Sequence, residues 1–418
     1  MKIRFIPTAV ALAATCALTA CDSSSSGSDQ SDGPATLTVW IMKDSVSDAY
    51  LQRFEKDFET QHQGTDLDIQ IQEWDGIGEK ITAALASKDA PDVLEVGNTQ
   101  VAQYAQSGGV LDLSDKVSDL QGADWLPGLA EPGKVDGKQY GIPWYAANRV
   151  VIYNKDLFAK AGVTAPPTTR EEWLETTGKL DMGGTQGIYL PGQNWYTLAG
   201  FVWEEGGELA VKDGNTWRGA LDSPEALKGM EFYKRLQALG KGPKDSDEAK
   251  PPQADVFAKG DVAQIIAVPG GAKIVEQANP ALAGKLGFFP IPGKTAGKPG
   301  ATFTGGSDLI VPVASAHQKA AYEVIAALAG EKEQTELART MSYVPNRTSL
   351  AGVLKDDEGD AAMAAAAAQG RATPNSPEWA AVEATNPVKE YMTAVLTGTD
   401  PAKAAKTASD AISKTLNP

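Results

Sequence analysis

Residues 36–54 read TLTVWIMKDSVSDAYLQRF and contain a strand followed by a helix. The β-branched and aromatic run at 36–41 is typical of a buried strand. Apolar side chains then recur at every fourth position, at Val46, Tyr50, Phe54 and Phe58, which indicates one face of a helix.

The same alternation continues along the chain. Further strands are predicted at 67–71, 93–96, 149–153, 261–268 and 309–313. Helices are predicted around 77–85, after a Thr168/Glu171 capping box, from Ser223-Pro224, across 314–340 and across 401–416. A hairpin turn is predicted at Asp213-Gly214. Strands that alternate with helices predict βαβ units. The fold class is therefore α/β, with mostly parallel sheets flanked by helices.

The composition limits what the protein can do. Its 418 residues allow about two domains at roughly 150 residues per domain. The net charge of −16 argues against a nucleic-acid partner, because a phosphate backbone requires a basic surface. With only 2 His and 2 Cys, the chain offers little for metal or imidazole chemistry, so no metal and no cofactor are predicted.

The N-terminus has the pattern of a secretory signal. Lys2 and Arg4 precede an apolar run at 6–18 that is too short to span a bilayer. The sequence Leu18-Thr19-Ala20-Cys21 resembles the lipobox of bacterial lipoproteins, in which the cysteine is lipidated; a plain signal peptide is the alternative. We therefore expect a signal peptide at 1–20, a flexible Ser/Gly/Asp tether at 21–35, and attachment to the extracellular face of the membrane through Cys21.

No catalytic motif is complete. Five residues separate Gly287 from Gly293 ahead of Lys294, where a phosphate-binding loop requires four, and the segment from Gly305 lacks the second glycine of a nucleophile elbow. Any two of the 54 acidic residues could meet in space, so a glycoside hydrolase stays open as an alternative.

Several segments, in order, resemble the sugar-binding lipoproteins of bacterial ABC importers, the family that includes maltose-binding protein. They are TLTVWIMKDS, APDVLEVGNTQVAQYAQSGGVLDLS, YGIPWYAANRVVIYNKDLF, APPTTREEWLETTGKL, GDVAQIIAVPGG, FTGGSDLIVPVAS, MSYVPNRTSL and VLTGTDPAKAAKTASDAI. The resemblance implies a two-lobed periplasmic-binding fold of type II, with discontinuous lobes joined by hinge crossovers. We place one lobe at 36–145 and 305–345, and the other at 146–304 and 346–418.

The resemblance also implies a function. The protein would be the receptor of an ABC sugar importer: a monomer, without catalytic residues, that closes on an oligosaccharide and delivers it to the membrane permease, with the cytoplasmic ATPase reached indirectly. A β-linked disaccharide of the diacetylchitobiose type is expected, with cello- or xylo-oligosaccharides next. A binding protein for a non-sugar solute is the further alternative.

A sugar needs an aromatic ring against its C–H face and planar polar groups around its rim. On that basis, and from the family's pattern, the candidate ligand-binding residues are Lys43, Asp44, Asn98, Thr99, Gln100, Trp144, Tyr145, Asn148, Arg149, Asn194, Trp195, Tyr196, Gly270, Gly271, Gly306, Ser307, Asp308 and Trp379. Trp195 is the preferred stacking ring. The alternatives to ligand contact are helix capping for Asp44, a helix start for 98–100, hinge packing for Trp144 and Tyr145, and surface packing for Trp379.

Overall fold

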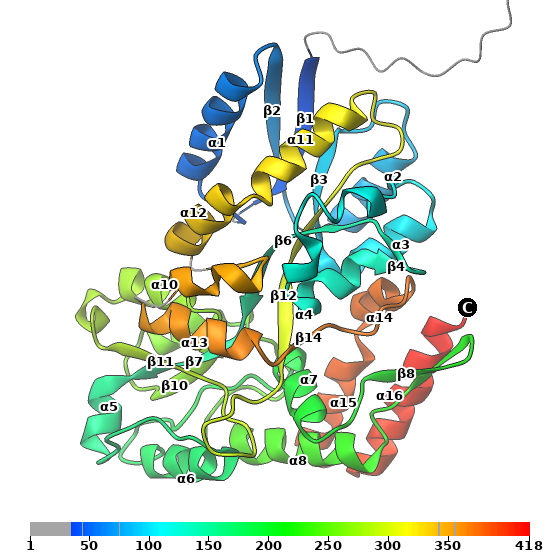
Figure 1. Ribbon diagram of the computed structural model, residues 1–418. Helices are drawn as coiled ribbons and strands as arrows, with labels where there is room; N and C mark the ends of the chain where they lie inside the picture. The colour runs from blue at the N-terminus through cyan, green and yellow to red at the C-terminus, as the bar shows by residue number, and fades with distance from the viewer. Residues whose placement is uncertain (1–34, 44, 75, 342, 355–356) are drawn as a thin grey trace, which may run out of the picture.

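The computed structural model describes residues 35–43, 45–74, 76–341, 343–354 and 357–418. The predicted signal peptide, the tether with Cys21 up to residue 34 and the candidate Asp44 lie outside these residues, whereas Ala35, the predicted end of the tether, is the first residue of β1. Figure 1 shows an upper and a lower half with the long strand β12 running between them. Among the described helices, none is both long and apolar enough to cross a membrane.

The upper half is built on one sheet with the strand order β13-β6-β12-β3-β1-β2, and β14 pairs with β12 beside it. Its strands are β1 (Ala35–Met42), β2 (Thr65–Gln72), β3 (Val93–Gly97), β6 (Ile142–Asn148), β12 (Thr302–Ile310), β13 (Val344–Pro345) and β14 (Gly370–Arg371). The helices α1 (Asp48–Gln61), α2 (Ile77–Leu85), α3 (Val101–Gln106), α4 (Pro127–Ala130), α11 (Gln318–Leu328) and α12 (Glu331–Met341) surround this sheet, and β4 (Lys134–Val135) pairs with β5 (Lys138–Gln139) at its side (Figure 1).

The lower half contains a second sheet with the order β10-β7-β11 and a separate hairpin. Its strands are β7 (Val150–Asn154), β10 (Gln264–Ala267), β11 (Leu286–Pro290), and β8 (Ala210–Asp213) with β9 (Thr216–Gly219). Its helices are α5 (Lys155–Lys160), α6 (Arg170–Leu180), α7 (Trp195–Glu204), α8 (Pro224–Gln237), α9 (Gln253–Phe257), α10 (Gly271–Ala278), α13 (Glu358–Ala367), α14 (Trp379–Thr385), α15 (Pro387–Leu396) and α16 (Pro401–Leu416).

The strand pairing agrees with the predicted βαβ units in one region only. β1 pairs in parallel with both β2 and β3, as the alternating sequence predicts. β12 runs antiparallel to β3 and β6, and the lower sheet is antiparallel throughout the described ladder. The prediction of mostly parallel sheets therefore needs correction, because β12 and β13 run against the direction that β1, β2, β3 and β6 share.

Two predicted helix limits also change. The segment 314–340 is not one helix, because α11 ends at Leu328 and α12 begins at Glu331 after Gly330. The capping box is formed one residue later than predicted: Thr169 Oγ1 accepts from Glu172 N, and the Glu172 carboxylate accepts from Thr168 N. Neither change moves a buried face, so the core predicted from the apolar periodicity remains.

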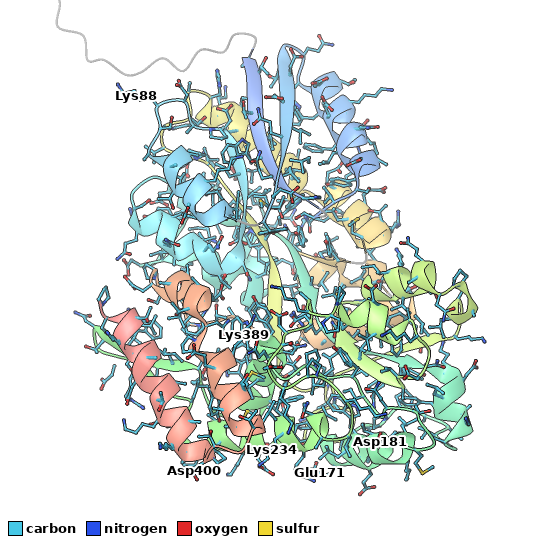
Figure 2. The ribbon with its side chains drawn as sticks, turned by 180° about the vertical axis from the view of Figure 1, so that it is seen from behind. Lys88, Glu171, Asp181, Lys234, Lys389 and Asp400 are labelled. Atoms are coloured by element: carbon cyan, nitrogen blue, oxygen red, sulfur yellow. The ribbon has the colours of Figure 1, made fainter. Side chains whose placement is uncertain are left out.

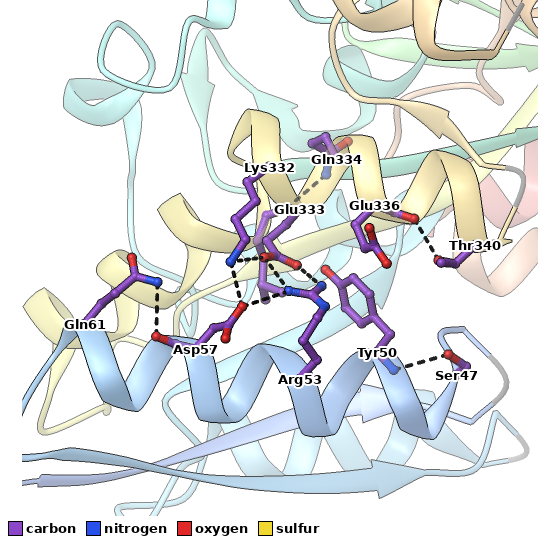
Figure 3. A network of polar contacts seen from close by, with 11 residues as sticks. Ser47, Tyr50, Arg53, Asp57, Gln61, Lys332, Glu333, Gln334, Glu336 and Thr340 are labelled. Carbon is purple, nitrogen blue, oxygen red and sulfur yellow. Dashed lines mark hydrogen bonds and ion pairs between the residues drawn. The ribbon is translucent and has the colours of Figure 1, made fainter.

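A polar network joins α12 to α1 on the outer side of the upper half. Figure 3 shows Arg53 lying between the carboxylates of Glu333 and Asp57. Arg53 Nη2 is 2.6 Å from Glu333 Oε2, and Lys332 Nζ is 2.6 Å from Asp57 Oδ2. The next residue along the helix, Gln334, is fully buried and donates through Nε2 to Trp144 O in β6 at 2.7 Å. α12 is therefore fixed both to α1 and to a strand that connects the halves.

Candidate ligand-binding cleft

The carboxyl ends of the three parallel strands open onto the space between the two halves. A cavity of about 400 Å³ lies there, which we call the aromatic chamber. It is lined by Lys43, Ser45, Trp74, Tyr145, Ala147, Arg149, Tyr196, Val268, Phe303, Gly305, Gly306, Ser307 and Tyr343. Ligands of open α/β sheets bind beyond the carboxyl ends of strands, which is where this chamber lies.

A second cavity of about 490 Å³ adjoins the first, and we call it the acidic chamber. It is lined by Gln100, Trp195, Tyr196, Asp247, Glu248, Ala249, Ala380, Glu383, Ala384, Asn386 and Lys389. Tyr196 lines both chambers, so the two adjoin at this ring, and together they are called the cleft. In the view from behind, Lys389 lies near the middle of the molecule, whereas Lys234 and Asp400 lie at its lower end (Figure 2).

Aromatic rings dominate the first chamber. Tyr145 stacks on Tyr343 with ring centroids 4.1 Å apart and planes 6° apart. Tyr196 stacks on Phe303 at 4.5 Å, and the Arg149 guanidinium lies 4.6 Å from the Tyr196 ring centroid. These rings support one another, and they give the chamber walls the apolar surface that a sugar face requires.

Trp74 is the ring with the most free surface. It is 45% exposed, although it lines the chamber. Trp195, the preferred stacking ring of the sequence analysis, is only 4% exposed and packs into the lower core. Trp74 was missed, but it comes two residues after the end of β2, where the rule about carboxyl ends of strands could have found it.

Charged side chains in the acidic chamber are paired. Arg149 Nη2 contacts Glu248 Oε1 at 2.7 Å, and Lys389 Nζ contacts Asp247 Oδ2 at 2.8 Å, which lowers the pKa of that aspartate. Glu383 accepts hydrogen bonds from Trp379 Nε1 at 2.9 Å and from Thr99 Oγ1 at 3.1 Å. Burial nevertheless raises the pKa of Glu383.

The structure brings eight of the predicted residues to the cleft. They are Lys43, Tyr145, Arg149, Gly306 and Ser307 in the aromatic chamber, Gln100 and Trp195 in the acidic chamber, and Tyr196 in both. Their contact with a ligand stays a prediction. The sequence analysis missed, besides Trp74, the lining residues Ser45, Asp247, Glu248, Phe303, Tyr343, Glu383 and Lys389, most of which belong to segments without a sequence signal.

Several predicted residues serve the framework instead. Trp144 is fully buried in the upper core, and the Asn98 and Asn148 side chains donate to carbonyl groups of β12. Asn194 caps α7, and Asp308 is fully buried on β12. Helix capping and strand packing therefore explain these positions, and they line neither chamber of the described cleft.

Four further predicted residues lie close to the cleft without lining it. Thr99 and Trp379 both bond to Glu383, so they position a lining residue. Gly270 and Gly271 begin α10 and lie outside both described chambers, although Val268 just before them lines the aromatic chamber. The expected direct contacts of these four residues with a ligand find no support in the geometry.

Two observations bear on a metal site and on a second cavity as alternatives to this cleft. Within the part of the chain that the structure describes, no group of three or more His, Cys, Asp or Glu side chains could hold a metal ion. A larger cavity of about 850 Å³ lies between α3 and the β8–β9 hairpin, and Tyr140 and Trp217 are among its lining residues. It has no pair of stacked rings among its lining residues, so the two-chamber cleft is the better candidate for a sugar site.

Comparisons with known proteins identify the family of this chain. Residues 43–335 match the model of the family described as bacterial extracellular solute-binding protein. The "Diacetylchitobiose binding protein DasA" of Streptomyces coelicolor is 43% identical over 400 residues, which cover 94% of this chain and 93% of that protein.

Solved structures show the same fold. The GacH receptor of Streptomyces glaucescens, solved unliganded and with acarbose, is 26% identical with a TM-score of 0.77 and coverage of 91% of this chain and 98% of the other. The sugar-binding protein MalE of Xanthomonas citri, at 24% identity, reaches a TM-score of 0.82 over 91% and 97% of the two chains. The chain has the type II fold of periplasmic sugar-binding proteins and belongs to the bacterial extracellular solute-binding protein family.

Proposed function

We propose that this protein binds a β-linked disaccharide, with diacetylchitobiose first, as the receptor of an ABC sugar importer. The observation that carries the proposal is the aromatic chamber, with stacked rings on its walls and a half-exposed tryptophan, Trp74, at its edge. The 43% identity to a diacetylchitobiose-binding protein over nearly the whole chain supports the choice of sugar.

The two chambers suit a ligand of two sugar units. Apolar rings in the aromatic chamber can cover the C–H face of one unit. The acidic chamber offers amide and carboxylate groups for the hydroxyls of the next unit, and Tyr196 lies between the two. A β-linkage is the part of this assignment that rests on the relative alone.

Delivery requires the two halves to move. We propose that the predicted lobes, 36–145 with 305–345 and 146–304 with 346–418, close on the sugar about the crossover strands β6 and β12. Ligand contacts with both lobes would favour the closed state. A monomer anchored through Cys21 would then present the loaded form to the membrane permease.

The acidic chamber favours binding over hydrolysis. A glycosidase needs one carboxyl group as acid and a second as base or nucleophile. Here Asp247 and Glu248 are paired with Lys389 and Arg149, and Glu383 is held by two donors. We therefore propose a receptor without a covalent step and without a cofactor.

A titration of the purified protein by calorimetry, with diacetylchitobiose, cellobiose, xylobiose and maltose, tests the proposal. We expect saturable binding that is tightest for diacetylchitobiose, with no cleavage product on chromatography. Cleavage of any of the sugars would support the hydrolase instead. Absence of binding to all four would contradict the proposed function and would direct the search to non-sugar solutes.

A matched pair of variants locates the site. Trp74→Ala should weaken binding about tenfold through lost stacking and leave the unfolding free energy nearly unchanged, because the ring is half-exposed. Trp195→Ala should lower the unfolding free energy by about 3 kcal/mol, because that ring is in the core. Wild-type affinity in Trp74→Ala would remove Trp74 from the site.

A further inference from the structure

Glu95, in β3, lies directly behind the aromatic chamber and is fully buried. Its carboxylate accepts four hydrogen bonds. Oε2 accepts from Met42 N at 2.8 Å, and Oε1 accepts from Ser45 Oγ at 2.7 Å, Tyr145 OH at 2.9 Å and Ser307 Oγ at 2.6 Å. One buried acid thus joins the end of β1 to β6 and β12.

The residues that carry these three hydroxyl groups, Ser45, Tyr145 and Ser307, line the aromatic chamber, whereas Glu95 does not. Each hydroxyl group carries one proton and two acceptor lone pairs. Ser307 Oγ also lies 3.1 Å from Tyr145 OH, so its proton can point to Glu95 or to that oxygen. In both arrangements the proton stays inside the network and does not point into the chamber.

We infer that Glu95 sets the hydrogen-bonding polarity of this wall, so that Ser45, Tyr145 and Ser307 offer only acceptor lone pairs to the ligand. The wall then selects a ligand group that donates, such as a sugar O–H or an acetamido N–H. A group that can only accept meets lone pairs and loses its hydrogen bond to water. Glu95 is a positioning residue, because it acts through these side chains and does not touch the ligand.

Packing alone does not account for an acid at this position. Burial raises the pKa of Glu95, and the four donors oppose that rise. A buried carboxylate is generally no more stabilising than an apolar side chain of similar volume. What a carboxylate does, and an apolar side chain cannot do, is hold the hydroxyl protons away from the chamber.

A first experiment does not depend on the identity of the ligand. Neutron diffraction from deuterated crystals of the ligand-free protein locates the three hydroxyl deuterons. We expect them within the network, on lines to Glu95 or between Ser307 and Tyr145. A deuteron on Ser45, Tyr145 or Ser307 that points into the chamber overturns the inference.

A second experiment rests on the proposed function and reads the polarity through the ligand. Calorimetry compares diacetylchitobiose with a series of monodeoxy and monofluoro analogues, since a C–F group accepts weakly and donates nothing. At the hydroxyl that faces the wall, both analogues should bind roughly tenfold more weakly than the parent sugar. If the parent sugar does not bind, the proposed function fails, and the neutron experiment alone decides the inference.

The substitution Glu95→Gln should reverse the hydrogen-bonding polarity of this wall. The Met42 N–H can only donate, so the amide oxygen must face it and the NH₂ group must face the three hydroxyls. The NH₂ group has two N–H donors, so up to two of the hydroxyls accept from it and can turn their protons toward the ligand. We expect the loss caused by fluorine to disappear in this variant, because fluorine now meets a donor.

The controls separate polarity from fold. Asp308→Asn changes a buried acid that lines neither described chamber, and it should keep the tenfold fluorine effect. If Glu95→Gln does not fold, the variants Ser307→Ala and Ser45→Ala are used in its place, because each removes one acceptor from the wall. An unchanged fluorine effect in Glu95→Gln, or in both alanine variants, overturns the inference, whereas its loss supports it.

Discussion

Two buried acids in neighbouring strands, Glu95 in β3 and Asp308 in β12, differ in the number of hydrogen bonds that their carboxylates accept. Glu95, behind the cleft, accepts four hydrogen bonds. Asp308, one residue beyond Ser307 on β12, is equally buried, but neither carboxylate oxygen has a hydrogen-bond partner among the described residues. A register shift between Ser307 and Asp308 separates the two environments.

The difference shows that burial alone does not define the chemistry of an acid. Burial raises the pKa of both groups, but for Asp308 no hydrogen bond opposes the rise. Glu383, in the acidic chamber, is intermediate with two donors. The number of donors therefore orders the three acids, and four measurements test that order.

The largest effect is expected for Glu95→Ala. The substitution leaves four donors without their acceptor, and unsatisfied buried donors cost about 1–3 kcal/mol each unless water reaches them. We expect the unfolding free energy to fall by about 3 kcal/mol in urea denaturation. Glu95→Gln, which keeps the volume, should lose less. An alanine variant as stable as the wild type would contradict the network.

Asp308→Asn should have the opposite sign. The aspartate has no hydrogen bonds among the described residues to stabilise its charged form, so the raised pKa of its carboxyl group lowers the stability of the folded protein at neutral pH. We expect the unfolding free energy at pH 7 to rise by about 1–2 kcal/mol in the asparagine variant. A decrease would show that the carboxyl group has a partner that the asparagine cannot replace.

The pH dependence sharpens the same contrast. Because the folded pKa of Asp308 is raised, its protonated form is favoured in the folded state, and the associated stability is lost as pH rises from the unfolded value of 3.8 through the folded value. The difference in unfolding free energy between Asp308→Asn and the wild type should therefore grow as pH rises above about 4. A difference that stays constant with pH would assign the effect to packing.

The smallest change is expected for Glu383→Gln. The glutamine oxygen can still accept from Trp379 or Thr99, so one of the two hydrogen bonds is kept. We expect a change in unfolding free energy of under about 1 kcal/mol. A loss as large as that of Glu95→Ala would remove the proposed order of the three acids.

The sequence predicted the local elements well. β1, α1 and β3 form where the β-rich runs and the four-residue apolar spacing place them, and the parallel pairing of β1 with β2 and β3 follows from the alternation. The predicted hairpin is also present, but its turn is Gly214-Asn215, one residue later than predicted, because Asp213 pairs with Thr216; Gly214 has a φ of 59°. These features depend on short-range spacing, which one chain displays directly.

The candidate site was predicted only in part. Residues at strand ends, such as Gln100, and at the crossovers, such as Tyr145, Arg149 and Ser307, reach the cleft. Asn98, Asn148 and Trp144 are also polar or aromatic residues at strand ends and crossovers, but their side chains point into the framework. Residue type and loop position therefore do not tell which way a side chain faces.

The order of strands and helices, the signal-like N-terminus and the resemblance to a binding-protein family can all be read from the amino-acid sequence. Which rings are exposed depends on the folded structure, since Trp74 and Trp195 differ in burial and not in type. The tertiary structure alone brought Met42, Ser45, Tyr145 and Ser307 around Glu95. The physical reason is that a hydrogen bond depends on distance in space, and the donor–acceptor separations here span 50 to 212 positions along the chain.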